Sequence, residues 1–470
     1  MELKTLRLLK LSSLFALILV GCARYHPPHV PVANHWTVTD RYIQQNDEKN
    51  LPFIAWWQGF HDLTLNHLIE QGLACNNRLN MSKGNIEAAA GELKRIRYQW
   101  IPNVDIALGY SKYPATGFPG IFAAIVPSYL MNVFYQVKQQ QQAKYVLQQT
   151  KAEDDALKLA IIAEISTSYF TYLAEVERKQ LIQTLATDIT QLSVISRKVY
   201  KDGLSSNIDP QELDSQVNII LGELEVIDQN IVFSRDAIRY LINENPGEIK
   251  ATVKFADLTN KQLIPSSLPV TVLENRPDMQ VATYQLRAAN VGVGLAASNL
   301  LPGMFLDFIG GVKAGDNRYR FPRKNVSFND QIFTVPLIKM PVWGDIAKAR
   351  GLDKVSYFNY IDTVQKALRD TTNALSAHDH FTNKWKQTSR AQKHLAKAYN
   401  LNERLYQRGI QTYVDTLKSK INLDRMNINL NQDKLLQLVS IVRLYQEMAG
   451  GYRADQVVTI GYEKVDRVLV

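Results

Sequence analysis

The sequence predicts a mainly α-helical protein that also contains four membrane-length β-strands and is built as a tandem duplication. Three observations support this class: long stretches with apolar residues at helical spacing, short segments of alternating polarity, and motifs that return in the same order about 200 residues later. The chain has 470 residues, of which 46% are hydrophobic and 21% charged. This composition excludes a disordered chain, a collagen and a small disulfide scaffold, so the protein must bury a core.

The N-terminus has the pattern of a lipoprotein signal peptide, which we place at residues 1–21. A basic segment precedes an apolar run at residues 11–20, which is about half the length that a membrane-spanning helix needs. The run ends in Leu-Val-Gly-Cys22, which resembles the bacterial lipobox. This resemblance implies that Cys22 carries acyl chains such as palmitate and that the protein is sorted to the outer membrane, because Ala23 rather than Asp follows. Residues 22–61 are then a lipidated, extended N-terminal segment.

We expect the other cysteine, Cys75, to be a small buried apolar residue.

Charge and motifs argue against nucleic-acid binding and against catalysis. The formal net charge of +9 is modest and spread along the chain, so it does not indicate a nucleic-acid surface. Gly292-x-Gly294-x-x-Ala297 imitates a dinucleotide fingerprint but lies inside an expected helix. His378 and His380 are too close in sequence to share a helical face, and no third ligand accompanies them. We therefore expect no enzyme activity, no cofactor and no metal.

Two sets of motifs recur along the chain. Ala88-Ala89 and Ile101-Pro102 return as Ala288-Ala289 and Leu301-Pro302, and a Tyr-x-x-Gly motif at Tyr200 and Gly203 returns at Tyr406 and Gly409. The first set is shifted by 200 positions and the second by 206, as a duplication with one short insertion would leave. We assign repeat 1 to residues 62–262, repeat 2 to residues 263–450 and a C-terminal tail to residues 451–470.

Each repeat is expected to run helix, strand, strand, helix. The first helices are predicted at residues 63–100 and 277–301, where Pro277 suits a helix start and Pro102 and Pro302 follow the ends. Alternating strands then begin near Val104 and Met304, and the returning strands are predicted at residues 129–137 and 331–340 after loops at 114–127 and 313–329.

The helices that follow are unusually long. Residues 138–200 contain no proline or glycine. In residues 213–241 apolar side chains recur in steps of four and three, which predicts a left-handed coiled coil. The corresponding pattern in the second copy is interrupted by Asp424 and Asn431.

Four strands are too few to close a barrel, because the smallest known transmembrane barrels have about eight and open edges are not tolerated in lipid. Several chains must therefore combine their strands. Three chains would give a 12-stranded outer-membrane barrel with four strands per chain, continued by a helical coiled-coil barrel, so we expect a homotrimer.

The order of several motifs resembles the outer-membrane efflux proteins of the TolC/OprM family, in the NodT-like lipoprotein branch. The resemblance covers essentially the whole mature chain and rests on Trp56-Trp57-Gln58-Gly59-Phe60-His61-Asp62, Leu68-Ile69, Asn275-Arg276-Pro277-Asp278, Ala288-Ala289-Asn290, Leu301-Pro302, Met340-Pro341-Val342-Trp343-Gly344, the two Tyr-x-x-Gly motifs and residues 444–452. It implies a trimeric barrel with a periplasmic helical tunnel that serves as exit duct for an inner-membrane efflux pump joined by a periplasmic adaptor. One departure is that the first copy lacks the family's Trp-Glu-x-Asp-x-Phe-Gly run and has residues 134–142 there instead, which leaves the end of that strand uncertain.

The resemblance also suggests where the duct would close. Counted from Gly409, Val414 takes the place of a bulky apolar family residue, Lys418 that of an aspartate and Ile421 that of an arginine, with Asp415 adjacent. Glu212 lies 206 positions before Lys418, so a pair between Glu212 and Lys418 of neighbouring helices is a hypothesis for holding the tip shut, and a merely solvated Lys418 is the alternative.

Two further groups of residues are candidates. The Tyr-x-x-Gly motifs at Tyr200, Gly203, Tyr406 and Gly409 predict tight helix turns that would contact the adaptor. Trp100 and Trp343 flank strands and could lie at the membrane interface, with core packing as the alternative.

We interpret the chain as a passive, lipid-anchored outer-membrane duct with a large periplasmic extension. A lipid-anchored periplasmic adaptor is the alternative, but it would have one helical hairpin between β-domains and no duplicated strand pairs. A lipid-anchored enzyme would need a catalytic constellation that the sequence lacks.

Overall fold

The structure is a computed structural model that describes residues 52–111, 120–204, 206–259, 275–313, 324–334, 336 and 338–454. The expected signal peptide, Cys22 and most of the tether and tail lie outside these residues, as does the start of the second repeat at residue 263. The described chain divides into two compact units, one with Gly84–Ala152 and Gln280–Thr363 and the other with residues 52–83, Glu153–Met279 and residues 364–454.

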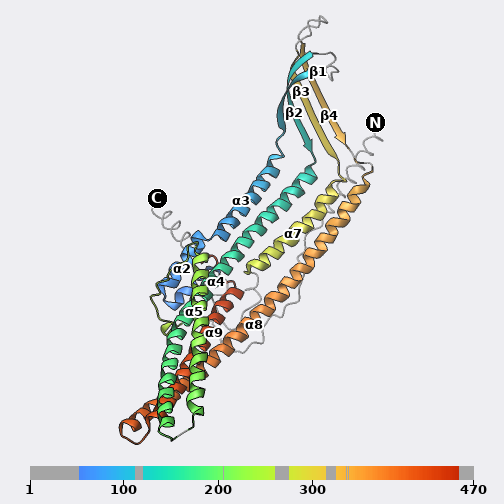
Figure 1. Cartoon of the computed structure of the whole chain (residues 1–470). Coiled ribbons are helices and arrows are strands. Elements are labelled where there is room, and N and C mark those ends of the chain that lie inside the picture. The colour runs from blue at the N-terminus through green and yellow to red at the C-terminus, as the bar shows by residue number, and fades with distance from the viewer. Residues whose placement is uncertain are drawn as a thin grey trace, which may run out of the picture. The chain divides into compact units, whose positions relative to one another are not determined.

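The first unit contains a four-stranded antiparallel sheet in the order β1-β2-β3-β4. The strands are β1 (Asn103–Ser111), β2 (Gly120–Met131), β3 (Gly303–Lys313) and β4 (Lys324–Thr334), and they lie side by side (Figure 1). Ile106 pairs with Ile125, Ile125 with Gly310, and Gly310 with Ser327, which gives one continuous register across both repeats. Parts of four long helices complete this unit: α3 (Asn77–Tyr98), α4 (Val133–Lys201), α7 (Pro277–Ser298) and α8 (Met340–Gln407).

The second unit holds the apolar core. It contains η2 (Trp56–Phe60), α2 (Leu63–Cys75), α5 (Ile208–Leu241), η3 (Phe255–Asp257), α9 (Tyr413–Glu447) and the remaining parts of α3, α4, α7 and α8. Trp56 is almost fully buried and stacks on Tyr445 with ring centroids 5.1 Å apart, and Phe60 packs against Phe170 at 4.9 Å. The Trp-Trp-Gln-Gly-Phe motif therefore anchors the start of the described chain to the end of α9.

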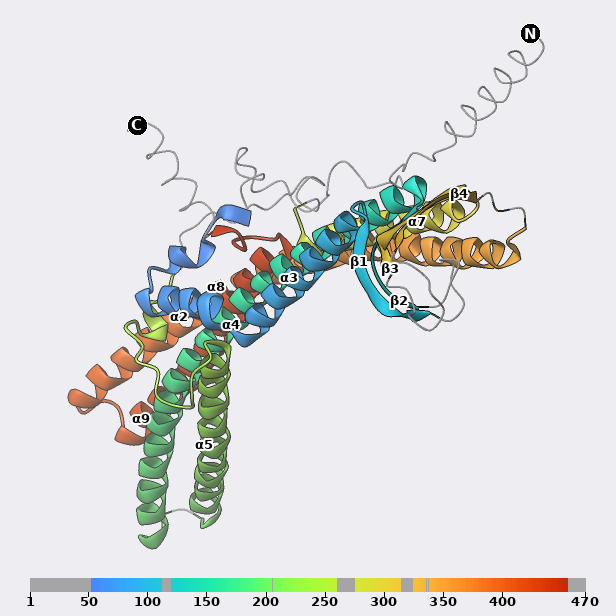
Figure 2. The same ribbon diagram turned by 90° about the horizontal axis from the view of Figure 1, so that it is seen from above.

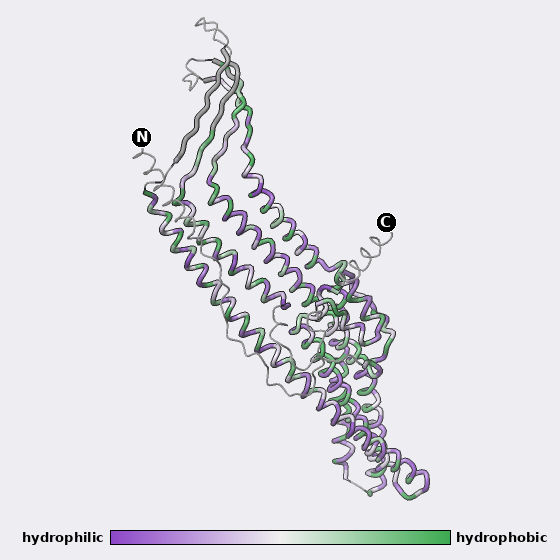
Figure 3. The backbone as a smooth tube through the Cα atoms, turned by 180° about the vertical axis from the view of Figure 1, so that it is seen from behind, coloured by the Kyte–Doolittle hydropathy of each residue, from purple (hydrophilic) through white to green (hydrophobic). Residues whose placement is uncertain are grey.

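The predicted apolar seam of the helix at residues 213–241 is confirmed. α4 and α5 run side by side (Figures 1 and 2), and the expected seam of α5 is buried at Ile220, Ile227 and Ile238. Ile220 and Ile227 share a cluster with Ile182 and Ile189 of α4. Apolar and polar residues alternate along the long helices (Figure 3), as expected when each buries only one stripe.

The first helix differs from the prediction, because it is two helices that meet at Asn76. Asn76 has an extended conformation (φ −60°, ψ 127°), and its Oδ1 accepts the backbone N–H of Arg78 at 2.8 Å. Its Nδ2 donates to the carbonyl oxygen of Leu241 at 2.7 Å. The break thus depends on a partner 165 residues away, which helix propensity does not reveal.

The returning strands also differ from the prediction. β2 and β4 begin at Gly120 and Lys324, inside segments that we expected to be loops. β2 pairs with the whole length of β1, and β4 pairs with the whole length of β3. Pro127 lies opposite Val104 in this pairing. The proline therefore marks no loop here, and helix α4 follows at Val133, where the side chain of Asn132 accepts the N–H of Tyr135 at 3.0 Å.

The expectation for Cys75 was wrong, because this residue is exposed. The buried face of α2 consists of Leu65, Leu68, Ile69 and Gly72. Cys75 ends the helix off that face, and the next residue, Asn76, is the buried one.

Candidate functional site

The sheet presents an exposed apolar face of membrane length. Val104, Ile106, Leu108 and Tyr110 alternate along β1 and are 60–75% exposed, and their register partners on β2 include Ile121 and Ile125, which are 67% and 54% exposed. The strands are 9, 12, 11 and 11 residues long, close to the length that crosses a bilayer. Water would not favour such a face, whereas lipid would.

The opposite face of β1 carries Asn103, Asp105, Ala107 and Gly109, which are polar or small. β1 and β4 are the outer strands of the sheet and pair on one side only among the described residues. Unpaired strand edges in lipid are costly, because each free N–H and C=O group loses its hydrogen bonds to water. This sheet is therefore incomplete as a membrane structure.

The two candidate interface tryptophans lie near the ends of the strands. Trp100 is half-buried in the turn before β1, and Trp343 is 60% exposed in the first turn of α8. Both positions suit an indole at a membrane surface, and the exposure of Trp343 argues against a core role within this chain.

The two Tyr-x-x-Gly turns have the same geometry. Gly203 and Gly409 have φ values of 75° and 72°, and their N–H groups donate to the carbonyl oxygens of Tyr200 and Tyr406 at 2.9 and 2.8 Å. The next residues, Leu204 and Ile410, donate to carbonyl oxygens five positions earlier. These are Schellman motifs, which need glycine at the left-handed position, so the predicted turns are confirmed.

The tip is the end of the long helices at the turns of Gly203 and Gly409. The residues proposed to close it lie in two different environments. Ile421 is buried and Val414 partly buried in the cluster that α9 shares with α4 and α5. Lys418 and Glu212 are exposed, and neither forms an ion pair within the described part of the chain. Asp415 lies in the first turn of α9 and accepts a hydrogen bond from the hydroxyl of Thr412 at 2.5 Å. Its own N–H donates to that oxygen, so Thr412 caps the helix.

A buried charged cluster near the tip was not predicted. Lys420 of α9 contacts both carboxylate oxygens of Asp188 of α4, at 2.9 and 2.8 Å, and Asp424 of α9 lies within hydrogen-bonding reach of the same carboxylate. Asp188 and Asp424 are 4% and 7% exposed. Burial, followed by the neighbouring Asp188, raises the pKa of Asp424 to about 7.

The sequence did contain a signal for this cluster. Asp424 interrupts the apolar seam of α9, and Lys420 lies one turn before it on the same face. A polar residue at a seam position indicates a buried partner, but the partner on α4 could not be named from spacing.

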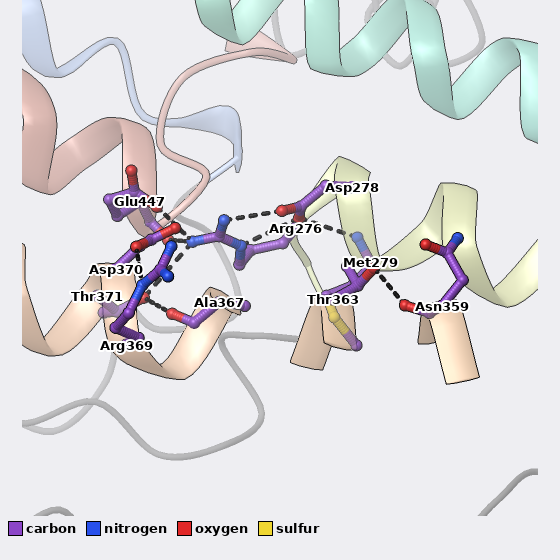
Figure 4. A network of polar contacts seen from close by, with 10 residues as sticks. All are labelled: Arg276, Asp278, Met279, Asn359, Thr363, Ala367, Arg369, Asp370, Thr371 and Glu447. Carbon is purple, nitrogen blue, oxygen red and sulfur yellow. Dashed lines mark hydrogen bonds and ion pairs between the residues drawn. The ribbon is translucent and has the colours of Figure 1, made fainter. Parts of the chain in front are cut away.

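A second buried network surrounds Arg276, in the Asn-Arg-Pro-Asp motif. Its guanidinium pairs with Asp278 at 2.8 Å and with Glu447 at 2.7 Å (Figure 4). It also donates to the carbonyl oxygen of Glu447 at 2.7 Å. These contacts fasten the start of α7 to the end of α9.

No helix within the described ranges is long and apolar enough to span a membrane. Within the same ranges no cluster of three or more His, Cys, Asp or Glu residues could hold a metal ion.

Residues 268–450 match the family model described as outer membrane efflux protein. The chain is therefore similar to outer membrane efflux proteins. It is 25% identical over 464 residues to the probable efflux pump outer membrane protein TtgC of Pseudomonas putida, which spans 93% of this chain and 94% of that protein. It is 23% identical to the outer membrane protein OprJ of Pseudomonas aeruginosa, across 93% of this chain and 95% of that one.

Solved outer membrane channels share the fold. The open-state outer membrane channel MtrE of Neisseria gonorrhoeae superposes with a TM-score of 0.79 at 19% identity, covering 92% of this chain and 98% of that one. The outer membrane channel CmeC of Campylobacter jejuni gives a TM-score of 0.78 at 17% identity, covering 94% and 97%. The predicted resemblance and the mainly α-helical fold class are confirmed, while the 12-stranded barrel and the trimer stay predictions.

Proposed function

We propose that this chain is the outer-membrane exit duct of a tripartite efflux system. It would passively conduct substrates from an inner-membrane pump and its periplasmic adaptor to the cell exterior. The observation that carries this proposal is the four-stranded sheet, which has an apolar exposed face of membrane length and two edges without a partner among the described residues. The relatives named efflux pump outer membrane proteins support it.

The working form in this proposal is a homotrimer. Three sheets joined edge to edge would give 12 strands and leave no free edge, which a single chain cannot achieve. The polar or small face of β1 would then line a water-filled lumen, and Val104, Ile106 and Leu108 would face lipid.

The tip of the helices would provide closure. Val414 and Ile421 would form its apolar part, and Lys418, Asp415 and Glu212 would place charges around it. Because an exposed ion pair contributes only about 0–1 kcal/mol, the apolar residues would account for most of the closure. The turns at Gly203 and Gly409 would present the tip to the adaptor.

Two further elements belong to the proposal. Acyl chains on Cys22 would anchor each chain in the outer membrane, because each buried methylene contributes about 0.8 kcal/mol. Residues 62–262 and 263–450 would be the two copies of the duplicated unit. The adaptor alternative is disfavoured, because the described chain has a strand pair before each of two helix pairs.

Purification in detergent and reconstitution into planar lipid bilayers would test the proposal. We expect a trimer that migrates differently on gels before and after heating, and stepwise ionic currents in the bilayer. A monomeric protein that produces no pore current would overturn it. For the tip, we expect Lys418→Glu to raise conductance above that of the wild type, and Glu212→Lys to do the same; unchanged conductance in both would remove these two residues from the closure.

A further inference from the structure

Four helices meet the sheet at one and the same edge. α3 leads into β1, β2 into α4, α7 into β3 and β4 into α8 (Figure 1). The strand register places these junctions side by side. The paired residues nearest to them are Asn103 with Ser128, Met131 with Met304, and Gly303 with Thr334. We call the adjoining residues 94–101, 133–144 and 338–350 the junction belt.

The junction belt exposes large apolar and aromatic side chains. Where β4 leads into α8, Ile338, Met340 and Trp343 are 79%, 71% and 60% exposed. Where α3 leads into β1, Tyr98 and Ile101 are also mostly exposed. Such side chains are favoured at the boundary between hydrocarbon and water, where a ring can bury its apolar part and keep its polar atom wet.

The same turns carry an excess of cations. Residues 94–101 contain three lysines and arginines and no carboxylate, and residues 338–350 contain three against a single aspartate. In α4, Lys138 and Lys144 precede the first carboxylate, which is Glu153. The helical turns next to the sheet are therefore positively charged on both outer helices and on α4.

Most of these cations are not neutralised within the chain. Arg95 pairs with Glu92 at 2.7 Å. Arg97, Lys348 and Arg350, by contrast, are exposed and form no ion pair in the part of the chain that the structure describes. The Nζ atom of Lys94 lies over the ring of Tyr98, 5.6 Å from its centroid. The belt thus offers positive charge to an anion from outside the chain.

On α8 the cations and the exposed indole share one side of the helix. Lys339, Trp343, Ala347 and Arg350 follow each other at steps of four, four and three, and all four are exposed. Lys339 contacts only a neutral group, the carbonyl oxygen of Asn299, at 3.5 Å. Two cations therefore flank an aromatic ring, an arrangement that fits a phosphate held next to an apolar chain.

We propose that the junction belt binds the headgroups of acidic phospholipids in the leaflet that faces the periplasm. The inference rests on the proposed function, because it takes the sheet to span the outer membrane. It adds a class of ligand and the side chains that recognise it. Lys339 and Arg350 on α8, and Lys94 and Arg97 on α3, contact the phosphates, while Trp343 and Tyr98 lie at the level of the headgroups.

Charge selects an acidic lipid over a zwitterionic one. Each lysine or arginine close to a membrane surface favours acidic headgroups about fivefold. The long stems of these side chains let the charge reach the headgroups while the helix stays below them. A free phosphate ion held by a few exposed side chains would compete with water, whereas lipid headgroups are concentrated at the level where Trp343 lies. The partner is therefore a lipid surface rather than a dissolved anion.

The effect should be confined to the belt. The potential of a charged membrane surface decays over a Debye length, about 10 Å at 0.1 M salt. Lys393 is exposed on the same helix but lies about 65 Å further along α8 than Arg350. It therefore provides a matched control for charge removal.

Quenching of tryptophan fluorescence by brominated lipids tests the proposal in the full chain. The purified trimer is reconstituted into phosphatidylcholine vesicles that contain equal mole fractions of either brominated phosphatidylglycerol or brominated phosphatidylcholine. We expect stronger quenching by phosphatidylglycerol, which gives a relative binding constant for the acidic lipid. Trp343→Phe should remove most of the difference between the two lipids, and high salt should reduce it in the wild type.

Variants of α8 identify the side chains involved. Lys339→Gln combined with Arg350→Gln should lower the relative binding constant about fivefold for each cation removed. Lys339→Arg combined with Arg350→Lys keeps both charges and should retain the preference. Lys393→Gln should behave as the wild type.

A trimer that conducts but is quenched equally by both lipids would overturn the lipid site while leaving the proposed function standing. The same holds if the double glutamine variant keeps the preference, or if added inorganic phosphate abolishes it, since the site would then bind any anion. A double variant that falls apart into monomers with unchanged lipid preference would assign both side chains to contacts between copies, against the proposal. A wild-type monomer without pore current would overturn both the lipid site and the function.

Discussion

Asn76 and Leu241 are joined by a hydrogen bond of 2.7 Å from the side-chain amide of one to the carbonyl oxygen of the other. Exactly 200 positions after Asn76, Arg276 donates to the carbonyl oxygen of Glu447, also at 2.7 Å. Leu241 and Glu447 are the last residues of α5 and α9, so each repeat ties the residue before its α3 or α7 helix to the end of its last helix. Matching contacts of this kind are what the proposed duplication would leave, although the side chains that make them differ.

Arg276→Ala should destabilise the protein strongly. The change removes an arginine side chain that is 10% exposed and leaves Glu447, whose side chain is 15% exposed, without its cation. Breaking a buried pair from one side costs about 3–5 kcal/mol. We expect a lower melting temperature by circular dichroism in detergent. Arg276→Lys is the control, because lysine keeps the charge but not the two-pronged geometry, and it should fall between alanine and the wild type. Equal melting temperatures for all three proteins would contradict this reading.

The stability of the contact between α4 and α9 should decrease as pH rises. The pKa of Asp424 is raised from 3.8 to about 7, so the folded state binds a proton that the unfolded chain releases at lower pH. The stabilisation is complete below pH 3.8 and is lost as pH rises through about 7, where Asp424 ionises beside Asp188. The groups around it are Asp188 of α4, Lys420 of α9 and Tyr399 of α8.

Melting temperatures measured across this range with Asp424→Asn provide the test. Asparagine keeps a hydrogen-bond donor toward Asp188 but cannot ionise, so this variant should lose much of the pH dependence and melt at a higher temperature than the wild type at pH values above the pKa. A variant with the same pH profile as the wild type would show that Asp424 does not hold the proton.

The sequence allowed much of the fold to be predicted, because the features involved are local. Periodicity located α5 and its seam at Ile220 and Ile227, and the Tyr-x-x-Gly motifs located both turns. The break at Asn76 and the start of β2 at Gly120 could not be predicted, since both depend on a partner strand or helix elsewhere in the chain.

For the candidate site too, local features could be predicted, whereas features that depend on distant parts of the chain could not. Alternating polarity predicted a strand near Val104, and Val104, Ile106 and Leu108 form the exposed apolar side of β1. The cluster of Asp188, Lys420 and Asp424 was missed, because burial of a charge depends on packing between helices that are more than 200 positions apart in sequence. From spacing alone, Asp424 was an interruption of the apolar seam of α9. In the structure its neighbour is Asp188 of α4.

Replacing Gly203, which has a left-handed backbone conformation, should destabilise the protein by an amount that depends on the new residue. Gly203→Ala forces a Cβ into a conformation with φ of 75°, which costs about 1–2 kcal/mol, although no neighbouring atom is in the way. Gly203→Asn should cost less, since Asn243 already adopts φ of 58° at the end of α5. Thermal melting of the two variants checks this order, and a more stable alanine variant would contradict the left-handed turn.

Charge placed on the apolar side of β1 should prevent assembly, whereas charge on the other side should be tolerated. Leu108 is 75% exposed within one chain, and in the proposed barrel it would face lipid, where an arginine costs about 2–4 kcal/mol near the middle of the bilayer. Asp105 lies three positions away on the opposite face and would line the water-filled lumen. We therefore expect Leu108→Arg to reduce the heat-modifiable trimer in isolated outer membranes and Asp105→Arg to leave it near wild type. If Asp105→Arg were the more harmful of the two, the assignment of the lipid-facing side would be reversed.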